Sequence, residues 1–484
     1  MSSAIEILGV AFTIVVIAAI IGYYARVRNA SLEQWAIGGR SVGTLLIWFL
    51  MAGEIYTAFT FLGVPGFAYA FGSPAYYALS YGVLAYLFSY ILLPKIWRAS
   101  KKNGIITQPD FFRERYGSKA LSTLVAIVGV IFMVPYLELQ VSAIALILGV
   151  MGNNLILPAF VMIITFGVVA GYVVMNGLRS ATFTSFFKDG LALVVIIVAI
   201  IAIPILRFGS LSNMMHQMVL THENYLYLPG NSHLGLSWFF SVVLMSSLGF
   251  FVWPHAFQAF LSAKNDNVLR KNAIFLPIYN VLLLVTVFMG FAALLLYPGL
   301  GLVHSNSAFL VLVKGTFPTW WTGVVTGAIL LGSMVPASVL LIASSTIISK
   351  NIYKDLIKKD ASDKSVTTVA RMFVIIITAV ALFFAIVLPA LFVNLLLVGY
   401  SGITLFLPGV ALGVFWKKAT KVGVFSGIVM GLATNVIFFL VITQYSAIVY
   451  PGLLGLLVDA VVTVLVSMVT KPPSEEVIKG FLEA

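Results

Sequence analysis

Residues 43–72 read GTLLIWFLMAGEIYTAFTFLGVPGFAYAFG, an apolar stretch that polar and helix-breaking residues interrupt in its middle. The stretch is long enough to cross the hydrocarbon core of a bilayer, which takes about 20 apolar residues. Gly53 and Glu54 stand near its midpoint, and Gly63 and Pro65 follow. Backbone that leaves a helix at this depth must be buried in protein or line a wet cavity, because lipid cannot bond its polar groups. The stretch therefore predicts a transmembrane helix that is broken near its middle.

A second stretch of the same kind, residues 236–265, reads LSWFFSVVLMSSLGFFVWPHAFQAFLSAKN. Ser246 and Ser247 interrupt it first, and Pro254 followed by His255 interrupts it again. Paired interrupted spans at corresponding places are the best sequence indication of a transporter binding site. The two stretches lie five spans apart in the count below. Because five is odd, a five-helix unit that starts at the first would recur upside down at the second, which predicts an inverted repeat.

The composition excludes several classes of protein. Of the 484 residues, 61% are hydrophobic and only 9% are charged, whereas a soluble globular domain is about 25% charged. An ordinary soluble enzyme and a disordered chain are therefore both excluded. The absence of cysteine excludes disulfides, thiolate nucleophiles and cysteine-based metal or iron–sulfur sites. The chain also lacks a glycine-rich phosphate-binding loop with its lysine, so we expect neither an ATP-driven pump nor an enzyme.

Apolar windows of spanning length recur along the whole chain, and we count thirteen. They lie near residues 4–25, 43–70, 75–98, 119–150, 154–177, 182–208, 236–262, 269–298, 321–350, 366–391, 393–416, 421–443 and 447–470. We therefore expect an all-α polytopic membrane protein with one transmembrane domain. Its parts would be an extra N-terminal helix at 4–25, a first inverted repeat at 43–208, a second at 236–416 and two C-terminal helices at 421–470.

The basic residues predict the orientation in the membrane. With thirteen spans, 26 of the 28 Lys and Arg residues fall on one set of alternating connections, and only Arg207 and Lys314 fall on the other. Cytoplasmic loops carry the excess of basic residues, so we expect a multi-pass protein of the cell membrane with its N-terminus outside and its C-terminus in the cytoplasm. The net charge of +12 is then a topology signal and does not indicate nucleic-acid binding. We expect the amphipathic stretch 105–116 to lie on the inner interface and the outer loops to act as lids.

Several motifs, in this order along the chain, resemble the sodium:solute symporter family, whose fold is the leucine-transporter-type five-plus-five inverted repeat. The resemblance covers roughly residues 30–470 and is strongest in GYSGITLFLPGVALGVFWKKATKVGVFSGIVMG at 399–431. The other matching stretches are TQPDFFRERYGS at 107–118, VPYLELQ at 134–140, WPHAFQAFLS at 253–262 and NIYKD at 351–355. The resemblance implies a secondary transporter with two broken helices and a substrate site near the bilayer midplane.

The departures from the family pattern bear on the coupling ion. Sodium-coupled members carry paired Ser/Thr hydroxyls at positions that correspond to Val335 and Pro336 here, with Gly332 upstream, so the side-chain oxygens for sodium are missing. The family's fifth-helix Trp-Thr-Asp is Phe-Thr-Ser at 183–185. The stretch GSMVPA at 332–337 and the first broken helix resemble the sodium-independent monocarboxylate permeases. The resemblance therefore implies proton-linked uptake of a small organic acid such as lactate or pyruvate, with no metal site and no cofactor.

Five ionisable residues within the predicted spans are candidates for proton coupling: Glu54, Glu138, Lys188, Asp189 and His255. A charged, unpaired carboxylate at this depth is costly, so each acid is a functional candidate by default, and histidine titrates near neutral pH. Lys188 and Asp189 together could form an element that opens and closes the inner gate. Each candidate also has a structural interpretation: Glu54 could bond loose backbone, Lys188 could extend to the inner interface, and His255 could hold a structural hydrogen bond.

The expected substrate site lies between the two broken helices, where amide-rich helix ends and hydroxyls would hold a carboxylate. The candidates for substrate binding are Gly53, Tyr56, Thr57, Thr60, Tyr136, Gln140, Trp253 and Tyr400. Another tyrosine cluster, which includes Tyr81, is more typical of packing. The alternatives are a symporter that couples an amino acid or another small solute to sodium through backbone carbonyls, and, as different classes, a sensor with a transporter fold or a channel. The sequence does not decide the substrate or the oligomeric state.

Overall fold

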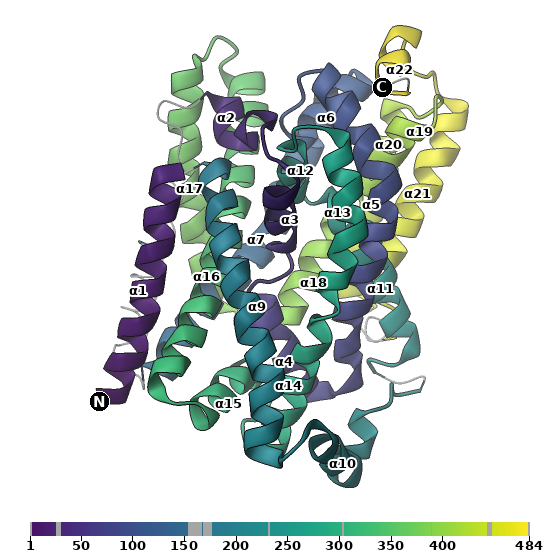
Figure 1. Cartoon of the computed structure of the whole chain (residues 1–484). Coiled ribbons are helices and arrows are strands. Elements are labelled where there is room, and N and C mark those ends of the chain that lie inside the picture. Colours follow the sequence, from purple (N-terminus) through teal and green to yellow (C-terminus); the bar gives the residue numbers. More distant parts are fainter. Residues whose placement is uncertain are drawn as a thin grey trace.

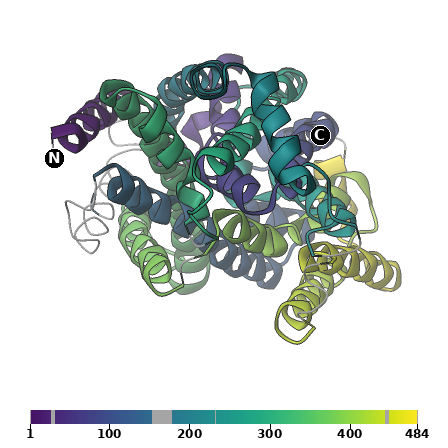
Figure 2. The ribbon, with the colours of Figure 1, turned by 90° about the horizontal axis from the view of Figure 1, so that it is seen from below.

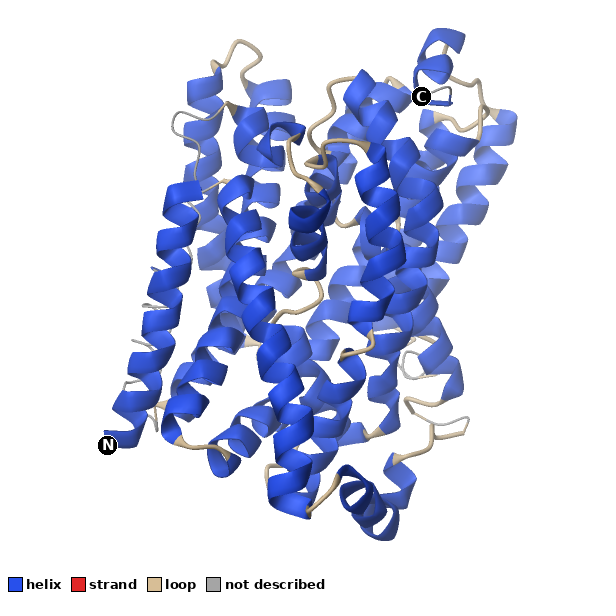
Figure 3. Cartoon of the chain, viewed as in Figure 1, coloured by secondary structure: helices blue, strands red, loops and turns tan. Residues whose placement is uncertain are grey.

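The computed structural model describes residues 2–25, 31–152, 167, 177–230, 233–302, 304–388, 390–442 and 448–482. Throughout these residues the structure is helical, and they contain no β-strand beyond an isolated bridge between Val42 and Ala263. The long helices run roughly parallel to one axis (Figure 1), and loops and short helices gather at the two ends of the bundle (Figure 3). The N-terminus and the C-terminus lie at opposite ends. The expected all-α polytopic fold is confirmed.

The helices coincide with the predicted apolar windows. Nine helical stretches of the described chain are long and apolar enough to cross a membrane, and two bent pairs bring the number to as many as 11. The unbroken stretches are α1 (Ser2–Ala25), α5 (Tyr77–Lys102), α7 (Lys119–Met151), α9 (Leu178–Phe208), α13 with α14 (Asp266–Asn280 and Leu283–Leu296), α16 (Thr319–Ile347) with η7 (Ile348–Ile357), α17 (Asp363–Val387), α20 (Lys421–Leu440) and α21 (Pro451–Val469). Apart from residues 167 and 177, the predicted span at 154–177 lies outside the described residues.

The two interrupted stretches are broken where the sequence predicts. In the first, α3 (Thr44–Ala52) ends before a non-helical segment at 53–57, and the π-helix η2 (Phe59–Gly63) and α4 (Val64–Phe71) continue the span. In the second, α11 (Leu236–Gly249) and η5 (Phe250–Val252) meet α12 (Pro254–Leu261) at Trp253, whose backbone is extended, and the axis bends by 50°. The two broken spans cross the molecule in opposite directions (Figure 1), as an inverted repeat requires.

A third bend separates α18 (Phe392–Ile403) from α19 (Phe406–Phe415) by 45°. The helix α16 lies at the centre of the bundle, since every residue of its most apolar window is buried, and it packs against α1, α7, α9 and α17. Figure 2 shows α1 and the pair α20–α21 at opposite edges of the bundle, so these helices flank the core that contains the broken spans.

The pair α20–α21 is held by a ridge of glycines spaced four residues apart. A Cβ atom added to Gly427 would come within 2.2 Å of a carboxylate oxygen of Asp459, and one added to Gly431 would come within 2.8 Å of the carbonyl oxygen of Gly455. Small residues of this kind allow the backbones of membrane helices to approach closely. The ridge therefore serves helix packing.

The short helix α6 (Gln108–Tyr116) lies at the end of the molecule that holds the C-terminus (Figure 1). Its amphipathic sequence suggested a position on the inner interface of the membrane. Seven of its nine residues are buried, however, so the helix lies within the protein. Gln108 donates a hydrogen bond to the carbonyl oxygen of Val252 at 2.6 Å, next to the second break. Arg115 donates to the carbonyl oxygens of Gly413 at 2.6 Å and Trp416 at 3.1 Å. The helix thus bonds to two bent spans.

A buried ion-pair network joins α6 to η7. The carboxylate of Asp110, which is 1% exposed, pairs with Lys350 and Arg113 and accepts a hydrogen bond from Asn351 at 2.8 Å. Burial alone would raise the pKa of Asp110, but the charges of Lys350 and Arg113 outweigh it and hold that pKa below its ordinary value of 3.8. Because the pKa is lower in the folded state, the ionised carboxyl stabilises the fold above about pH 3.8, and this stabilisation is lost as the pH falls through the lowered pKa.

Replacing Asp110 with Asn should lower the thermal unfolding midpoint of the purified protein in detergent. Removing one partner of a buried ion pair leaves the other charges uncompensated, at a cost of about 3 kcal/mol. The variant should also lose the fall in stability that the parent shows below about pH 4, which intrinsic tryptophan fluorescence can follow. The matched control is Glu114→Gln on the same helix, whose half-exposed pair with Arg113 should contribute less than about 1 kcal/mol. Equal unfolding midpoints for the two variants would contradict the prediction that the ion pairs of Asp110 stabilise the fold.

Candidate functional site

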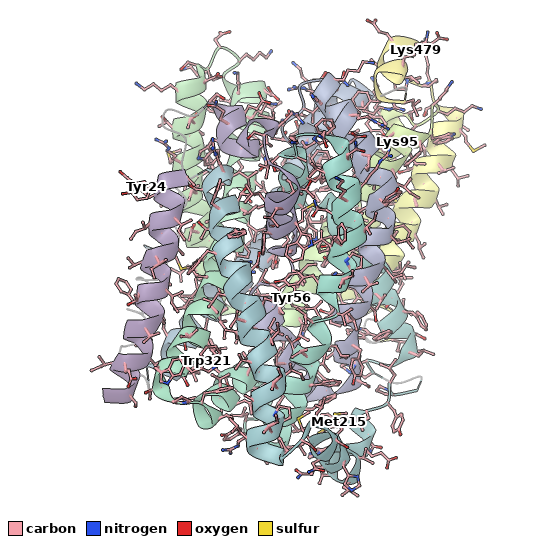
Figure 4. The ribbon with its side chains drawn as sticks, viewed as in Figure 1. Tyr24, Tyr56, Lys95, Met215, Trp321 and Lys479 are labelled. Carbon is pink, nitrogen blue, oxygen red and sulfur yellow. The ribbon has the colours of Figure 1, made fainter. Side chains whose placement is uncertain are left out.

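The first break leaves main-chain carbonyl groups at the middle of the bundle, and the ammonium group of Lys188 on α9 bonds two of them. The Nζ atom donates to the carbonyl oxygen of Gly53 at 3.0 Å and to that of Tyr56 at 2.9 Å. Figure 4 shows Tyr56 midway between Lys95 near one end of the molecule and Met215 near the other. The lysine therefore supplies, at mid-depth, the donors that the interrupted helix lacks.

Lys188 and Asp189 form a buried ion pair beside this break. The Nζ atom lies 2.9 Å from Oδ1 of Asp189, and both side chains are fully buried. A Cβ atom added to Gly53 would lie 2.9 Å from the carbonyl oxygen of Phe49 and 3.1 Å from both the Lys188 ammonium and the Asp189 carboxylate, so a glycine suits this close approach. The interpretation that Lys188 extends to the inner interface is therefore wrong, because the side chain points into the broken helix.

Hydroxyl groups bond the remaining carbonyl groups of the break. Tyr136 on α7 donates to the carbonyl oxygen of Glu54 at 3.1 Å, and Thr60 donates to that of Ile55 at 2.5 Å. Tyr56 donates its own hydroxyl to the carbonyl oxygen of Tyr279 on α13 at 2.6 Å. Each carbonyl group from Gly53 to Tyr56 thus has a side-chain donor, so the unwound segment is satisfied without water or lipid.

A cavity with an empty volume of about 320 Å³ lies between the two breaks. Its lining comes from both broken spans and from α5, α7 and α18: Glu54, Phe59, Tyr81, Tyr136, Phe250, Trp253, His255, Ala256, Leu396 and Tyr400. Every lining side chain is at most 9% exposed. Aromatic rings dominate the walls, and the formally charged lining residues are Glu54 and His255. Small-molecule sites are typically concave and mostly apolar, with a few polar groups that fix the orientation of the ligand.

Glu54 and His255 meet in the wall of this cavity. The Nε2 atom of His255 lies 2.7 Å from Oε2 of Glu54, within ion-pairing distance. Oε2 has no aligned hydrogen-bond donor, and Nδ1 of His255 has no hydrogen-bond partner in the described part of the chain. Each residue stands at the break of a different span, so the contact joins the two interrupted helices.

The ring of Trp253 lies at the centre of the aromatic wall. Its centroid is 5.4 Å from that of Tyr136, 5.4 Å from that of His255 and 5.1 Å from that of Tyr400, all with edge-to-face geometry. Tyr81 contacts Tyr400 at 5.9 Å from the other side. Such edge-to-face contacts stabilise aromatic clusters beyond their area burial, so the wall has a defined shape.

Five of the predicted site residues line the cavity: Glu54, His255, Tyr136, Trp253 and Tyr400. Other predicted residues lie beside it and are used within the protein. The backbone of Gly53 and the hydroxyls of Tyr56 and Thr60 belong to the break, and the hydroxyl of Thr57 accepts a hydrogen bond from the amide of Phe59 at 3.1 Å.

Glu138 and Gln140 on α7 are buried but do not line this cavity. Neither amide atom of Gln140 has a hydrogen-bond partner among the described residues, and neither does Oε1 of Glu138. Their proposed roles stay predictions. Sequence reasoning assigned Tyr81 to packing, whereas it lines the cavity, and it missed Phe59, Phe250, Ala256 and Leu396. Phe250 stands three residues before the break at Trp253 and Leu396 one turn before Tyr400, which is the signal that identifies them.

The positions that hold sodium in the family's sodium-coupled members lie against the first break. A Cβ atom added to Gly332 would lie 3.7 Å from the backbone of Thr57. Val335 and Pro336 follow on the same helix without a hydroxyl. The nearby hydroxyls of Ser333 and Ser338 donate to carbonyl oxygens of their own helix, at 3.1 and 2.6 Å. No group of three His, Cys, Asp or Glu residues suited to a metal occurs in the described residues.

Known proteins are similar to this chain over most of its length. It is 36% identical over 454 residues to YodF, a Bacillus subtilis protein described as an uncharacterized symporter, covering 93% of this chain and 91% of that one. It is 32% identical over 411 residues to a Rhizobium johnstonii protein described as a monocarboxylate transport permease, covering 83% and 81% of the two chains.

The fold matches the solved structure of a Na⁺-coupled sialic acid symporter with a TM-score of 0.81, 15% sequence identity, and coverage of 97% of this chain and 98% of that one. At that identity the similarity shows the fold alone, which is the leucine-transporter type with two broken helices. The profile of the sodium:solute symporter family matches residues 35–431. The protein is therefore a secondary transporter for a small solute and no enzyme, and the chain belongs to the sodium:solute symporter family.

Proposed function

We infer that this transporter takes up a small monocarboxylate, such as lactate or pyruvate, together with a proton and without sodium, by alternating access. The observation that carries this proposal is that the ammonium group of Lys188 donates hydrogen bonds to the carbonyl oxygens of Gly53 and Tyr56. An unwound segment at mid-membrane that presents carbonyl oxygens is the usual place for a coupling cation. Here the Nζ atom of Lys188 occupies that place.

The surroundings of Lys188 support coupling without sodium. A sodium ion in this place would need oxygen ligands, and Val335 and Pro336 on the facing helix offer no side-chain oxygen. An added cation would also meet the positive charge of Lys188 at short range, in a setting where charges are poorly screened. The rival proposal, sodium coupling with an amino acid or another solute, would require the ammonium group to leave the break.

The cavity supports a small monocarboxylate as substrate. Aromatic walls suit a short apolar chain, and the single acid–base pair, Glu54 with His255, suits a single ionised group. The similarity to a monocarboxylate transport permease points to the same substrate class. Glu54, which lines the cavity, is the first candidate to carry the proton, and Glu138, which is buried on α7 outside the cavity, is the second.

The arrangement in the membrane follows from the charges. Lys95 and Lys479 lie at the end of the molecule that holds the C-terminus (Figure 4), and 26 of the 28 basic residues belong to the same set of connections. By the positive-inside rule this end would be cytoplasmic and the N-terminus external. We further propose repeats at 43–208 and 236–416, with 4–25 and 421–470 as additions to this core.

Uptake of labelled lactate into liposomes that contain the purified protein should follow a pH gradient with the acid side outside. One pH unit corresponds to about 1.4 kcal/mol and should therefore sustain about tenfold accumulation for one proton per lactate. A sodium gradient alone should give none, and protein-free liposomes are the control. Accumulation with sodium alone would favour the sodium-coupled rival. Flux that only equilibrates lactate, without saturation, would indicate a channel, and binding without flux would indicate a sensor.

Replacing Lys188 with Met should abolish accumulation driven by the pH gradient. The variant keeps the length of the side chain but leaves two buried carbonyl groups and the Asp189 carboxylate without their cation. Breaking a buried ion pair costs about 3–5 kcal/mol, so initial uptake should fall more than about tenfold and the unfolding midpoint should fall with it. Lys95→Met, which removes a charge near the end of the bundle, should leave both quantities unchanged. Full uptake by the Lys188 variant would contradict the proposal.

A further inference from the structure

We propose that His255 binds the carboxylate of the substrate. In the absence of substrate, the side-chain carboxylate of Glu54 takes the place of the substrate carboxylate. In the empty cavity the carboxylate of Glu54 pairs with the imidazole ring of His255. An arriving carboxylate takes that place while Glu54 accepts a proton. The inference rests on the proposed function, since it names the groups that recognise a monocarboxylate and couple it to a proton.

The geometry places an acid and a base of the protein where a bound anion would need them. The Nε2 atom of His255 and the Oε2 atom of Glu54 are 2.7 Å apart in the cavity wall. Glu54 is 9% exposed and His255 is 3% exposed, so the pair is shielded from bulk water yet adjoins empty space. A substrate carboxylate carries the same pair of oxygens as the side chain of Glu54 and can make the same contact.

The contact is exchangeable because the rest of the protein does not fix the two groups against each other. Oε2 of Glu54 lacks an aligned donor, and Nδ1 of His255 has no partner among the residues that the structure describes. By contrast, the backbone of Glu54 is held, because its carbonyl oxygen accepts the hydroxyl of Tyr136 at 3.1 Å. The carboxyl group of Glu54 can thus turn away from His255 without movement of the break.

Charge balance then couples the proton to the anion. The ionised pair of Glu54 and His255 is neutral, and the neighbouring pair of Lys188 and Asp189 is neutral as well. An anion that entered alone would leave an excess negative charge in a buried cavity, which is expensive. A proton on Glu54 removes the excess, because the substrate carboxylate then pairs with protonated His255.

The other elements packed around the pair bring no further charge that could perform this task. Among the described residues, the titratable groups that face it are the phenols of Tyr81 and Tyr86 on α5, Tyr136 on α7 and Tyr400 on α18. The Lys188–Asp189 pair on α9 contacts Gly53, and the Asp189 carboxylate interacts electrostatically with Glu54, but that carboxylate is already paired with Lys188 at 2.9 Å. The segments α3, α11 and α16 contain no titratable side chain. Glu54 is thus the acid placed to receive the proton.

The same arrangement limits the substrate to acids with one carboxylate. The cavity lining offers His255 as its single basic side chain, and the rings of Trp253, Tyr136 and Tyr400 surround it. A second carboxylate would be buried against aromatic walls without a partner, which is costly. Short monocarboxylates should therefore compete with lactate, and dicarboxylates of the same length should not.

The test measures proton uptake on binding, with the full-length purified protein in detergent. Calorimetric titration with lactate in two buffers of different ionisation enthalpy gives the number of protons taken up per lactate bound. The parent protein should take up about one proton at pH 7.5, as one neutralised charge requires. Infrared difference spectra of lactate binding should show the band of a newly protonated carboxyl group in the parent protein and no such band in Glu54→Gln, where His255 is left as the proton acceptor in the cavity wall. The control is Asp459→Asn, a buried acid in α21 remote from the cavity, which should behave as the parent.

A second variant tests the anchor independently of Glu54. His255→Gln removes the cation that pairs with the substrate, and lactate affinity should fall at least about tenfold, which corresponds to 1.4 kcal/mol. Undiminished binding by this variant, or the same new carboxyl band in the Glu54 variant, would overturn the inference and leave monocarboxylate transport standing. Absence of lactate binding by the parent protein, together with no uptake into liposomes, would overturn the proposed function itself.

Discussion

The requirement that every main-chain polar group in the membrane find a partner governs this structure. Where the helix from Thr44 is interrupted at Gly53, four successive carbonyl groups lose their helical donors. They are bonded by Lys188 and by the hydroxyls of Tyr136 and Thr60, from two other helices and from the broken span itself. Because those donors come from α7 and α9, the first break holds three spans in a fixed relation, and the cavity is shaped by that relation.

The cavity in turn depends on both breaks. The first supplies Glu54 and the second supplies Trp253 and His255, so neither broken span forms the site alone. A membrane protein can keep such groups at mid-depth only when their charges balance locally. Two acid–base pairs at the first break, Lys188 with Asp189 and His255 with Glu54, meet this condition. In our proposal the pair of Glu54 and His255 separates when substrate binds, whereas the pair of Lys188 and Asp189 stays together and holds the break.

Much of this architecture was predictable from the residue types. Gly53 with Glu54, and Trp253 with Pro254, mark the breaks, because glycine weakens a helix, a buried carboxylate needs a partner, and proline lacks the N–H group that a helix interior uses. The directions in which side chains point were less predictable. Tyr56, Thr57 and Thr60 were expected in the site and bond the backbone instead, while Tyr81 was expected in packing and faces the cavity. In a helix that is apolar on all sides, the sequence carries no periodicity that tells one face from another. Its rotation is therefore decided by neighbouring helices, as the burial of Lys188 also illustrates.

The short helix α6 reduces the number of independent ways in which its end of the bundle can move. It holds the second broken span through Val252, the bent pair α18–α19 through Gly413, and the end of α16 through Lys350. A motion of any one of these segments must either carry the others along or first break a buried polar contact. Each such contact is expensive to leave unmade away from water. Rearrangement at this end is therefore concerted, and its speed is limited by how fast buried polar contacts separate.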